Sequence, residues 1–98
     1  MNLLKLLKKD LPFLGKKPEN TELIKLYPNP TSDTIKVIFS TKKPRTLKLS
    51  NNQGKEIFLR TLNEETSTKL NLELLPDGIY YLDVNTNYGK TTKLIIKE

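Results

Sequence analysis

The stretch of residues 68–86, TKLNLELLPDGIYYLDVNT, decides the fold of this chain. In its first half, leucines alternate with polar residues, which is the period of a β-strand that buries one face. A proline, an aspartate and a glycine follow, and together they favour a tight turn. The second half is apolar on both sides. The sequence therefore predicts two strands joined by a turn, and it places Leu70, Leu72 and Leu74 on the buried face of the first.

The same texture continues in both directions, from residue 23 to the end of the chain. Short β-rich runs recur at intervals of about ten residues with turn residues between them, a pattern typical of an antiparallel sandwich or barrel. Gly54 and Gly78 provide permissive backbone at two of these turns. The last two runs are the most apolar, so we expect them to be central or covered strands. Seven strands are predicted, at 23–27, 34–40, 45–51, 56–62, 68–74, 78–86 and 90–97.

Alternation also predicts the buried faces of three earlier strands. Because 36% of the residues are apolar and only seven (Tyr 4, Phe 3) are aromatic, the core is expected to consist of leucine, isoleucine and valine. Such a core is thin for a deep ligand cavity. We therefore predict one small all-β domain over residues 23–98. The inward-facing residues are expected to be Ile35, Val37 and Phe39, then Leu47 and Leu49, then Ile57 and Leu59.

Residues 1–22 have a different character and are predicted to be an extension of the domain. Leucines gather near one helical face of residues 1–14 with lysines opposite, which favours a short amphipathic helix. Residues 15–22 are polar and contain glycine and proline, as a linker does. Lysines interrupt the leucines, so the apolar core of a secretory signal peptide is lacking. A basic amphipathic helix suits a membrane surface, but a helix this short is marginal in water, so a frayed extension or a piece of upstream linker is the favoured interpretation and a membrane surface is the alternative.

Cysteine and histidine are both absent from the chain. Their absence excludes disulfides, thiolate nucleophiles and Cys-based metal sites, along with the commonest general base near neutral pH. The net charge is +6, and of the seventeen basic residues only Arg45 and Arg60 are arginines. Lysine suits solvated faces and weak attraction to polyanions, whereas base and phosphate reading prefers the planar guanidinium. We therefore expect no nucleic-acid partner.

The remaining polar clusters do not form a convincing catalytic or metal site. The serines have no histidine to pair with, which leaves a serine–lysine pair as the open alternative. Glu64 and Glu65 are adjacent and lack the fixed separation that paired catalytic carboxylates need. The basic cluster at residues 42–45 is interpreted as a charged connection that protects an edge strand. The sequence thus predicts no enzyme, no metal site, no cofactor and no small-molecule substrate.

Residues 26–33 read LYPNPTSD, with two prolines around an asparagine. The prolines favour an extended segment that then turns. Thr31, Ser32 and Asp33 are suited to cap that turn through hydrogen bonds from side chain to backbone. This segment closely resembles the opening motif of the type A C-terminal sorting domains of cargo proteins of the type IX secretion system (Por secretion system) in Bacteroidota.

Three further segments resemble the same family, in its order and at its spacing. Residues 49–57 (LSNNQGKEI) are similar to its strand, glycine turn and strand. Residues 75–84 (LPDGIYYLDV) are similar to its leucine, proline, glycine and tyrosine signature, and residues 93–97 (KLIIK) to its terminal lysine-flanked strand. By position, the resemblance carries over Tyr27, Pro28, Asn29, Pro30, Gly54, Gly78, Tyr80, Lys93 and Lys97.

The resemblance implies a seven-stranded antiparallel immunoglobulin-like β-sandwich that acts as a non-catalytic sorting signal. It also implies recognition by the outer-membrane type IX translocon and removal by a sortase-like surface protease. The cargo would then be secreted or attached to the cell surface. Most carried-over residues are expected to support the fold, with Lys93 and Lys97 as the candidates for translocon contact. Residues 1–22 resemble neither the signal peptide nor the large cargo domain that normally precede this domain.

The alternative hypothesis is a free-standing β-sandwich that binds carbohydrate or protein. That function requires several exposed, coplanar aromatic rings on one face or at one loop cluster. The rings on which the alternative depends are Tyr27, Phe58, Tyr80, Tyr81 and Tyr88.

Overall fold

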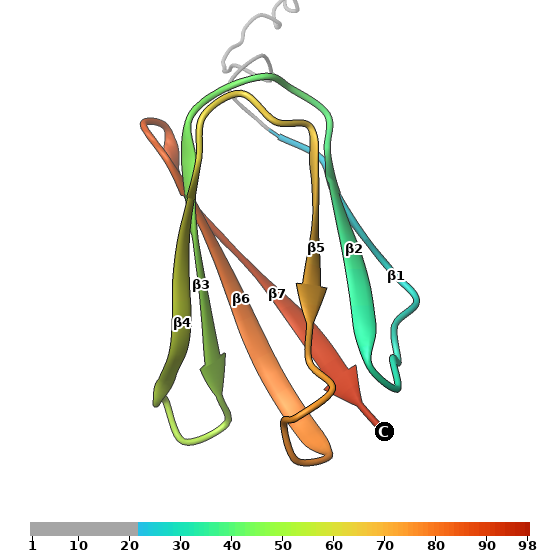
Figure 1. The fold of residues 1–98 in the computed structure, drawn as a ribbon. Coiled ribbons are helices and arrows are strands. Elements are labelled where there is room, and N and C mark those ends of the chain that lie inside the picture. Colours follow the sequence, from blue (N-terminus) through green and yellow to red (C-terminus); the bar gives the residue numbers. More distant parts are fainter. Residues whose placement is uncertain (1–21) are drawn as a thin grey trace, which may run out of the picture.

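The computed structural model describes residues 22–98 (Figure 1). The predicted helix of residues 1–14 and the linker up to residue 21 lie outside the described residues. Residues 22–98 are all β and include no helix that would cross a membrane. The seven strands are β1 (Ile24–Tyr27), β2 (Thr34–Phe39), β3 (Arg45–Asn51), β4 (Glu56–Leu62), β5 (Ser67–Asn71), β6 (Gly78–Thr86) and β7 (Gly89–Lys97).

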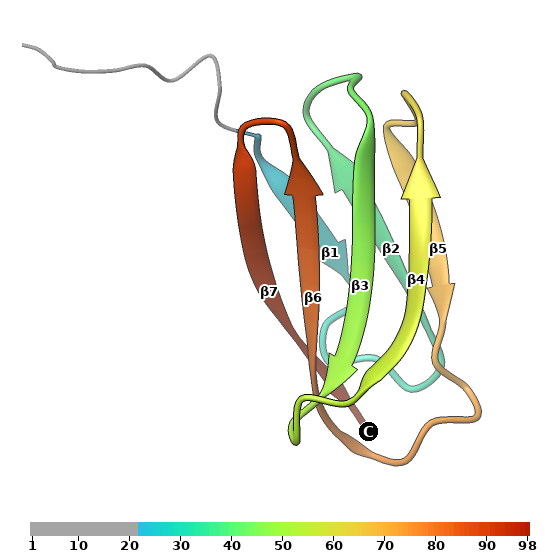
Figure 2. The same ribbon diagram turned by 90° about the vertical axis from the view of Figure 1, so that its left-hand side faces the viewer.

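The strands form two antiparallel sheets that face each other, as Figures 1 and 2 show from two sides. One sheet has the strand order β1-β2-β5 and the other the order β4-β3-β6-β7. The chain passes from one sheet to the other after β2, after β4 and after β5. Each sheet therefore contains one pair of neighbouring strands that are not consecutive in sequence, β2 with β5 in the first sheet and β3 with β6 in the second. The prediction of seven antiparallel strands is confirmed.

One continuous core fills the space between the two sheets. Both sheets contribute to it through alternate residues of their strands, as the period of a half-buried strand requires. The predicted inward faces of β2 and β3 are confirmed, since all five of their apolar residues are buried. The buried apolar residues are Ile24, Ile35, Val37, Phe39, Leu47, Leu49, Leu62, Leu70, Leu72, Tyr80, Leu82, Val84 and Ile95.

The prediction that Ile57 and Leu59 share a buried face of β4 is wrong. A β-bulge lies between Leu49 and Ser50 of the neighbouring strand, where the pairing steps from Leu49↔Phe58 to Ser50↔Glu56. The bulge leaves Ile57 as an extra residue, so Ile57 and Phe58 both pack against the core. Beyond the bulge the phase is reversed, and Leu59 is 57% exposed on the outer face.

The prediction that Leu74 continues the buried face of β5 is also wrong. β5 ends at Asn71, and the N–H of Leu72 then donates to the carbonyl of Asp33. A turn follows, closed by a hydrogen bond from the N–H of Leu75 to the carbonyl of Leu72. The turn ends the alternation, so Leu74 is 95% exposed while Leu75 packs against the core.

The positions of the last two strands only half agree with the sequence. β6 is central, between β3 and β7, as expected from its apolar character. β7 is an edge strand, so the prediction that it is central or covered is wrong in the first respect. Its outer edge is partly closed by the segment that connects β1 and β2, which lies at the same end of the molecule as the C-terminus (Figure 1).

Candidate functional site

The segment that follows β1 leaves its own sheet and joins the edge of the other one. β1 ends at Tyr27, and the bonds Tyr27–Pro28 and Asn29–Pro30 are both cis. Thr31 then forms a parallel bridge with Lys97 of β7. Its N–H donates to the carbonyl of Ile96 over 2.9 Å, and its carbonyl accepts from the N–H of Glu98 over 2.8 Å. The opening motif therefore ends as a backbone partner of the C-terminal strand.

The side chain of Asn29 extends this pairing by one step along β7. Its Nδ2 donates to the carbonyl of Leu94 over 2.8 Å, and its Oδ1 accepts from the N–H of Ile96 over 3.0 Å. A carboxamide has the donor and acceptor of a peptide group, so it satisfies two groups of an edge strand as a neighbouring strand would. We refer to Asn29 and Thr31 with residues 94–98 as the edge clasp. It joins segments about 65 positions apart in the chain.

Asparagine is suited to this position for a geometric reason. Ser or Thr at this position carries one hydroxyl, whereas Asn presents a donor and an acceptor side by side. The exposed prolines on either side of Asn29 have no backbone N–H, so they cannot donate a hydrogen bond to the edge of β7. Thr31 is 2% exposed, and its Oγ1 donates to the carbonyl of Thr34 over 2.7 Å, which fixes the return toward β2.

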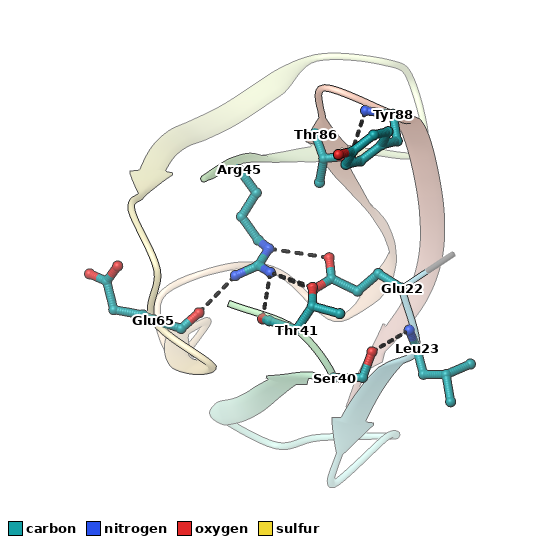
Figure 3. A network of polar contacts seen from close by, with 8 residues as sticks. All are labelled: Glu22, Leu23, Ser40, Thr41, Arg45, Glu65, Thr86 and Tyr88. Atoms are coloured by element: carbon teal, nitrogen blue, oxygen red, sulfur yellow. Dashed lines mark hydrogen bonds and ion pairs between the residues drawn. The ribbon is translucent and has the colours of Figure 1, made fainter. Parts of the chain in front are cut away.

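A second polar cluster lies where β3 begins, at the end of the molecule away from the C-terminus (Figure 1), and contains a buried charge. Arg45 is 2% exposed, and the central carbon of its guanidinium, Cζ, lies over the ring of Phe39, 4.0 Å from the ring centroid. Figure 3 shows the guanidinium pointing into the space between Glu22, Thr41 and Glu65. Its Nη2 pairs with Oε2 of Glu22, and its Nε donates to Oε1 over 3.2 Å. We refer to Arg45, Glu22, Thr41 and Glu65 as the arginine cluster.

The arginine cluster connects three separate parts of the chain. The carbonyls of Thr41 and Glu65 accept from the guanidinium over 2.9 and 2.7 Å, so both loops that lead away from β2 and β4 are bonded to it. Glu22, whose side chain is 6% exposed, adds the residues before β1. The interpretation of residues 42–45 as a charged connection that protects an edge strand is therefore wrong, because Arg45 is buried and the two strands that this segment joins, β2 and β3, are both interior strands of their sheets. Backbone N–H groups of Glu65 itself and of Asn63 lower the pKa of the exposed Glu65 carboxyl.

The two lysines of the C-terminal strand occupy inner positions of β7. Lys93 lies opposite Leu82 of β6, which is fully buried, so its half-buried stem lies at the margin of the core. Lys97 is 7% exposed. Its Nζ donates to the carbonyl of Leu75 over 3.0 Å and lies 3.5 Å from Oδ1 of Asp77. Lys97 therefore ties the C-terminal strand to the turn before β6.

These observations can be set beside known proteins. A family model described as the secretion system C-terminal sorting domain matches residues 25–98. The chain belongs to this family. The resemblance to the sorting domains of type IX secretion is thereby confirmed. A search of the curated proteins finds no match. The matched part of the sorting domain includes both sides of the edge clasp.

The other sequence-predicted residues of the sorting domain serve local structure. Gly54 adopts φ 85° in the β3–β4 turn, where Oδ1 of Asn51 accepts from the N–H groups of Gln53 and Lys55. Gly78 begins β6 opposite Lys97. Of the residues carried over from the family, the structure thus brings together Asn29, Gly78 and Lys97 around the end of β7. Sequence reasoning missed the pairing roles of Thr31, Glu22 and Arg45.

Tyr80 anchors the start of β6 through its hydroxyl. The ring is 4% exposed, and its OH donates to the carbonyl of Pro76 over 2.5 Å. Replacing Tyr80 with phenylalanine removes the donor and leaves a carbonyl without a partner. We expect the free energy of unfolding to fall by about 1 kcal/mol. Urea titration checks this against Tyr81→Phe, whose ring is 38% exposed and which should change little. Equal losses in the two variants would contradict the role of the hydroxyl.

The aromatic rings of the sorting domain do not form a common platform. Tyr27 lies opposite Lys36 on the outer face of the first sheet, whereas Tyr81 lies on the outer face of the second. Tyr88 is in the β6–β7 turn, with the Nζ of Lys43 4.6 Å from its ring centroid. Tyr80 is buried and Phe58 packs against the core. This arrangement does not support the alternative of a free-standing module that binds carbohydrate or protein through such a platform.

Proposed function

We propose that this sorting domain directs a cargo protein across the outer membrane through the type IX translocon. A sortase-like surface protease then removes the domain, and the cargo is attached to the cell surface or released. The observation that carries the proposal is the edge clasp in a chain that belongs to the sorting-domain family. The edge clasp places the opening motif and the terminal strand side by side, so a single partner can contact both.

The proposal is for a signal without catalytic activity, and it rests on the family, which is one of secretion sorting domains. We infer that the sandwich is immunoglobulin-like for two reasons. Its seven strands divide into facing sheets of order β1-β2-β5 and β4-β3-β6-β7, with crossovers between the sheets as in that fold. In addition, the hydroxyl of Tyr80, near the start of β6, donates to the carbonyl of Pro76 four residues earlier, as in a tyrosine corner. The domain is proposed to comprise residues 23–98, with Glu22 holding the end of the extension against it.

The roles proposed for the two lysines differ. Lys93 has part of its surface free, and we propose that it contacts the translocon. Lys97 supports the fold instead, because its ammonium is buried against the Leu75 carbonyl and Asp77. Removing residues 94–98 would also take Ile95 out of the core. Such a deletion would therefore abolish export through unfolding, whether or not the translocon reads this strand.

The proposal is tested by export of a reporter. A signal peptide and a fluorescent protein are placed before the whole 98-residue chain in a type IX-competent bacterium. We expect fluorescence on the cell surface or in the medium, dependent on the translocon. The controls are the same fusion in a translocon-deficient strain and a fusion that ends at residue 21. Reporter that stays in the periplasm with the domain folded would overturn the proposed function.

A further inference from the structure

The edge clasp covers only the C-terminal half of the outer edge of β7. The outward groups of residues 94–98 that bond to it are the carbonyls of Leu94 and Ile96 and the N–H groups of Ile96 and Glu98. In an antiparallel strand, alternate residues turn both backbone groups to the same side. The N–H and carbonyl groups of Lys90 and Thr92, and the N–H of Leu94, must therefore also point outward.

These five backbone groups form an open edge. Within residues 22–98, none of them has a hydrogen-bond partner, and Lys90, Thr92 and Leu94 are all exposed. Edge strands with free groups accept further strands, which is why most proteins shorten, bulge or cover them. β7 is nine residues long, and the pairing with β6 is continuous from Gly89 to Lys97. Residues 90–94 are thus a regular segment that no other part of residues 22–98 pairs with on its outer side, and on which another strand can pair.

Apolar side chains lie beside this open edge on the outer face of the sheet. Tyr81 of β6 lies opposite Leu94, and Ile79 lies opposite Ile96. Leu94 is 45% exposed, Ile79 41% and Tyr81 38%. Four partly covered side chains are a small surface compared with the roughly 800 Å² per partner of a stable protein interface. An occupant must therefore gain much of its affinity from the backbone edge, as an added strand does.

The charges around the open edge indicate what kind of strand fits. Lys90 is exposed and Lys93 is half-buried, and no carboxylate of residues 22–98 lies within ion-pair distance of either. Lysines and inward-pointing charges on an edge hinder indiscriminate pairing. An opposite charge on the incoming strand converts this hindrance into a favourable cross-strand pair. The edge therefore selects strands with acidic side chains.

We propose that residues 90–94 of β7 bind an extended strand of a secretion-machinery protein by strand addition. The strand carries acidic side chains near Lys90 and Lys93 and an apolar side chain against Leu94 and Tyr81. The edge clasp closes the remainder of the edge, so it sets where the added strand ends. This inference rests on the proposed function and names the surface and the partner chemistry through which it acts.

The test compares Thr92→Pro with Thr92→Val in the reporter fusion. Both variants lose the 2.7 Å bond from Oγ1 of Thr92 to Oδ1 of Asp83. Only proline removes the outward N–H and places a ring at the edge, and β6 does not use that N–H, so the pairing within the sheet is kept. We expect Thr92→Pro to lower surface reporter by about tenfold or more, the loss that about 1.4 kcal/mol of binding energy produces. Thr92→Val should export like the unmodified fusion.

A second pair of variants decides the matter if Thr92→Pro does not fold. Leu94→Ser removes an exposed side chain beside the open edge, and Leu74→Ser removes one that is 95% exposed elsewhere. We expect only Leu94→Ser to lower export. Equal export within a folded pair overturns strand addition while leaving the proposed function intact. Retention of the unmodified fusion in the periplasm overturns the proposed function, and this site with it.

Discussion

Replacing Glu22 with alanine is expected to lower the free energy of unfolding by about 3–5 kcal/mol. The side chain of Arg45 is 0% exposed, and Glu22 is the carboxylate that pairs with it in the arginine cluster. Without Glu22 the guanidinium keeps its bonds to the carbonyls of Thr41 and Glu65, but its charge remains buried without a counter-ion. Removing one member of a buried pair costs more than the pair contributes, because the other charge is left uncompensated. Urea unfolding of the full chain measures the loss.

A double variant separates this cause from general damage. Glu22→Ala combined with Arg45→Met removes the buried charge together with its partner, so we expect it to recover a large part of the loss. Glu64→Ala is the matched control, since this exposed glutamate makes no ion pair within residues 22–98. A loss below about 1 kcal/mol for Glu22→Ala, the range of a surface pair, would contradict the importance of burial.

The same residues show what the sequence can and cannot predict about this fold. Alternation predicted the buried faces of β2 and β3 because both strands keep one phase throughout. Arg45 has the phase of Leu47 and Leu49, two and four positions later, which is the signal that marks it as inward-facing. The lysines two and three positions earlier, Lys43 and Lys42, made Arg45 look like part of an exposed basic cluster. The bulge that reverses β4 has no marker in the sequence, because it arises from pairing between two strands.

The sequence named part of the edge clasp but did not predict how its residues are arranged. The resemblance identified Asn29 and the lysine-flanked strand, and both lie within the residues that the family model matches. Their contact depends on β1 and β7 being the edges of facing sheets, which follows from the order of all seven strands. The role of Lys97 follows from its phase, since Lys93, Ile95 and Lys97 alternate on the inner face. Lys97 is the more buried of the two lysines, and its ammonium contacts the turn at Leu75 and Asp77.

Replacing Asn29 with alanine is expected to lower the free energy of unfolding by about 1–3 kcal/mol, the sum of two hydrogen bonds. The local effect should be sharper than the global one. The N–H of Ile96 donates to Oδ1 of Asn29, so its hydrogen exchange should quicken more than that of residues bonded to β6. Asn52→Ala, in the exposed β3–β4 turn, is the control and should leave this exchange unchanged.

Asn29→Asp distinguishes the two bonds that Asn29 makes. The carboxylate still accepts from the N–H of Ile96, but it has no donor for the carbonyl of Leu94, which lies 2.8 Å from Nδ2. Two oxygens at that separation repel each other, so aspartate should destabilise the domain at least as much as alanine while keeping part of the protection of Ile96. If aspartate leaves the free energy of unfolding unchanged, the amide is not bonded to both groups and the edge clasp is incorrect. If both variants lose stability in this order, then the asparagine of the opening motif is required because an edge strand needs a donor and an acceptor together.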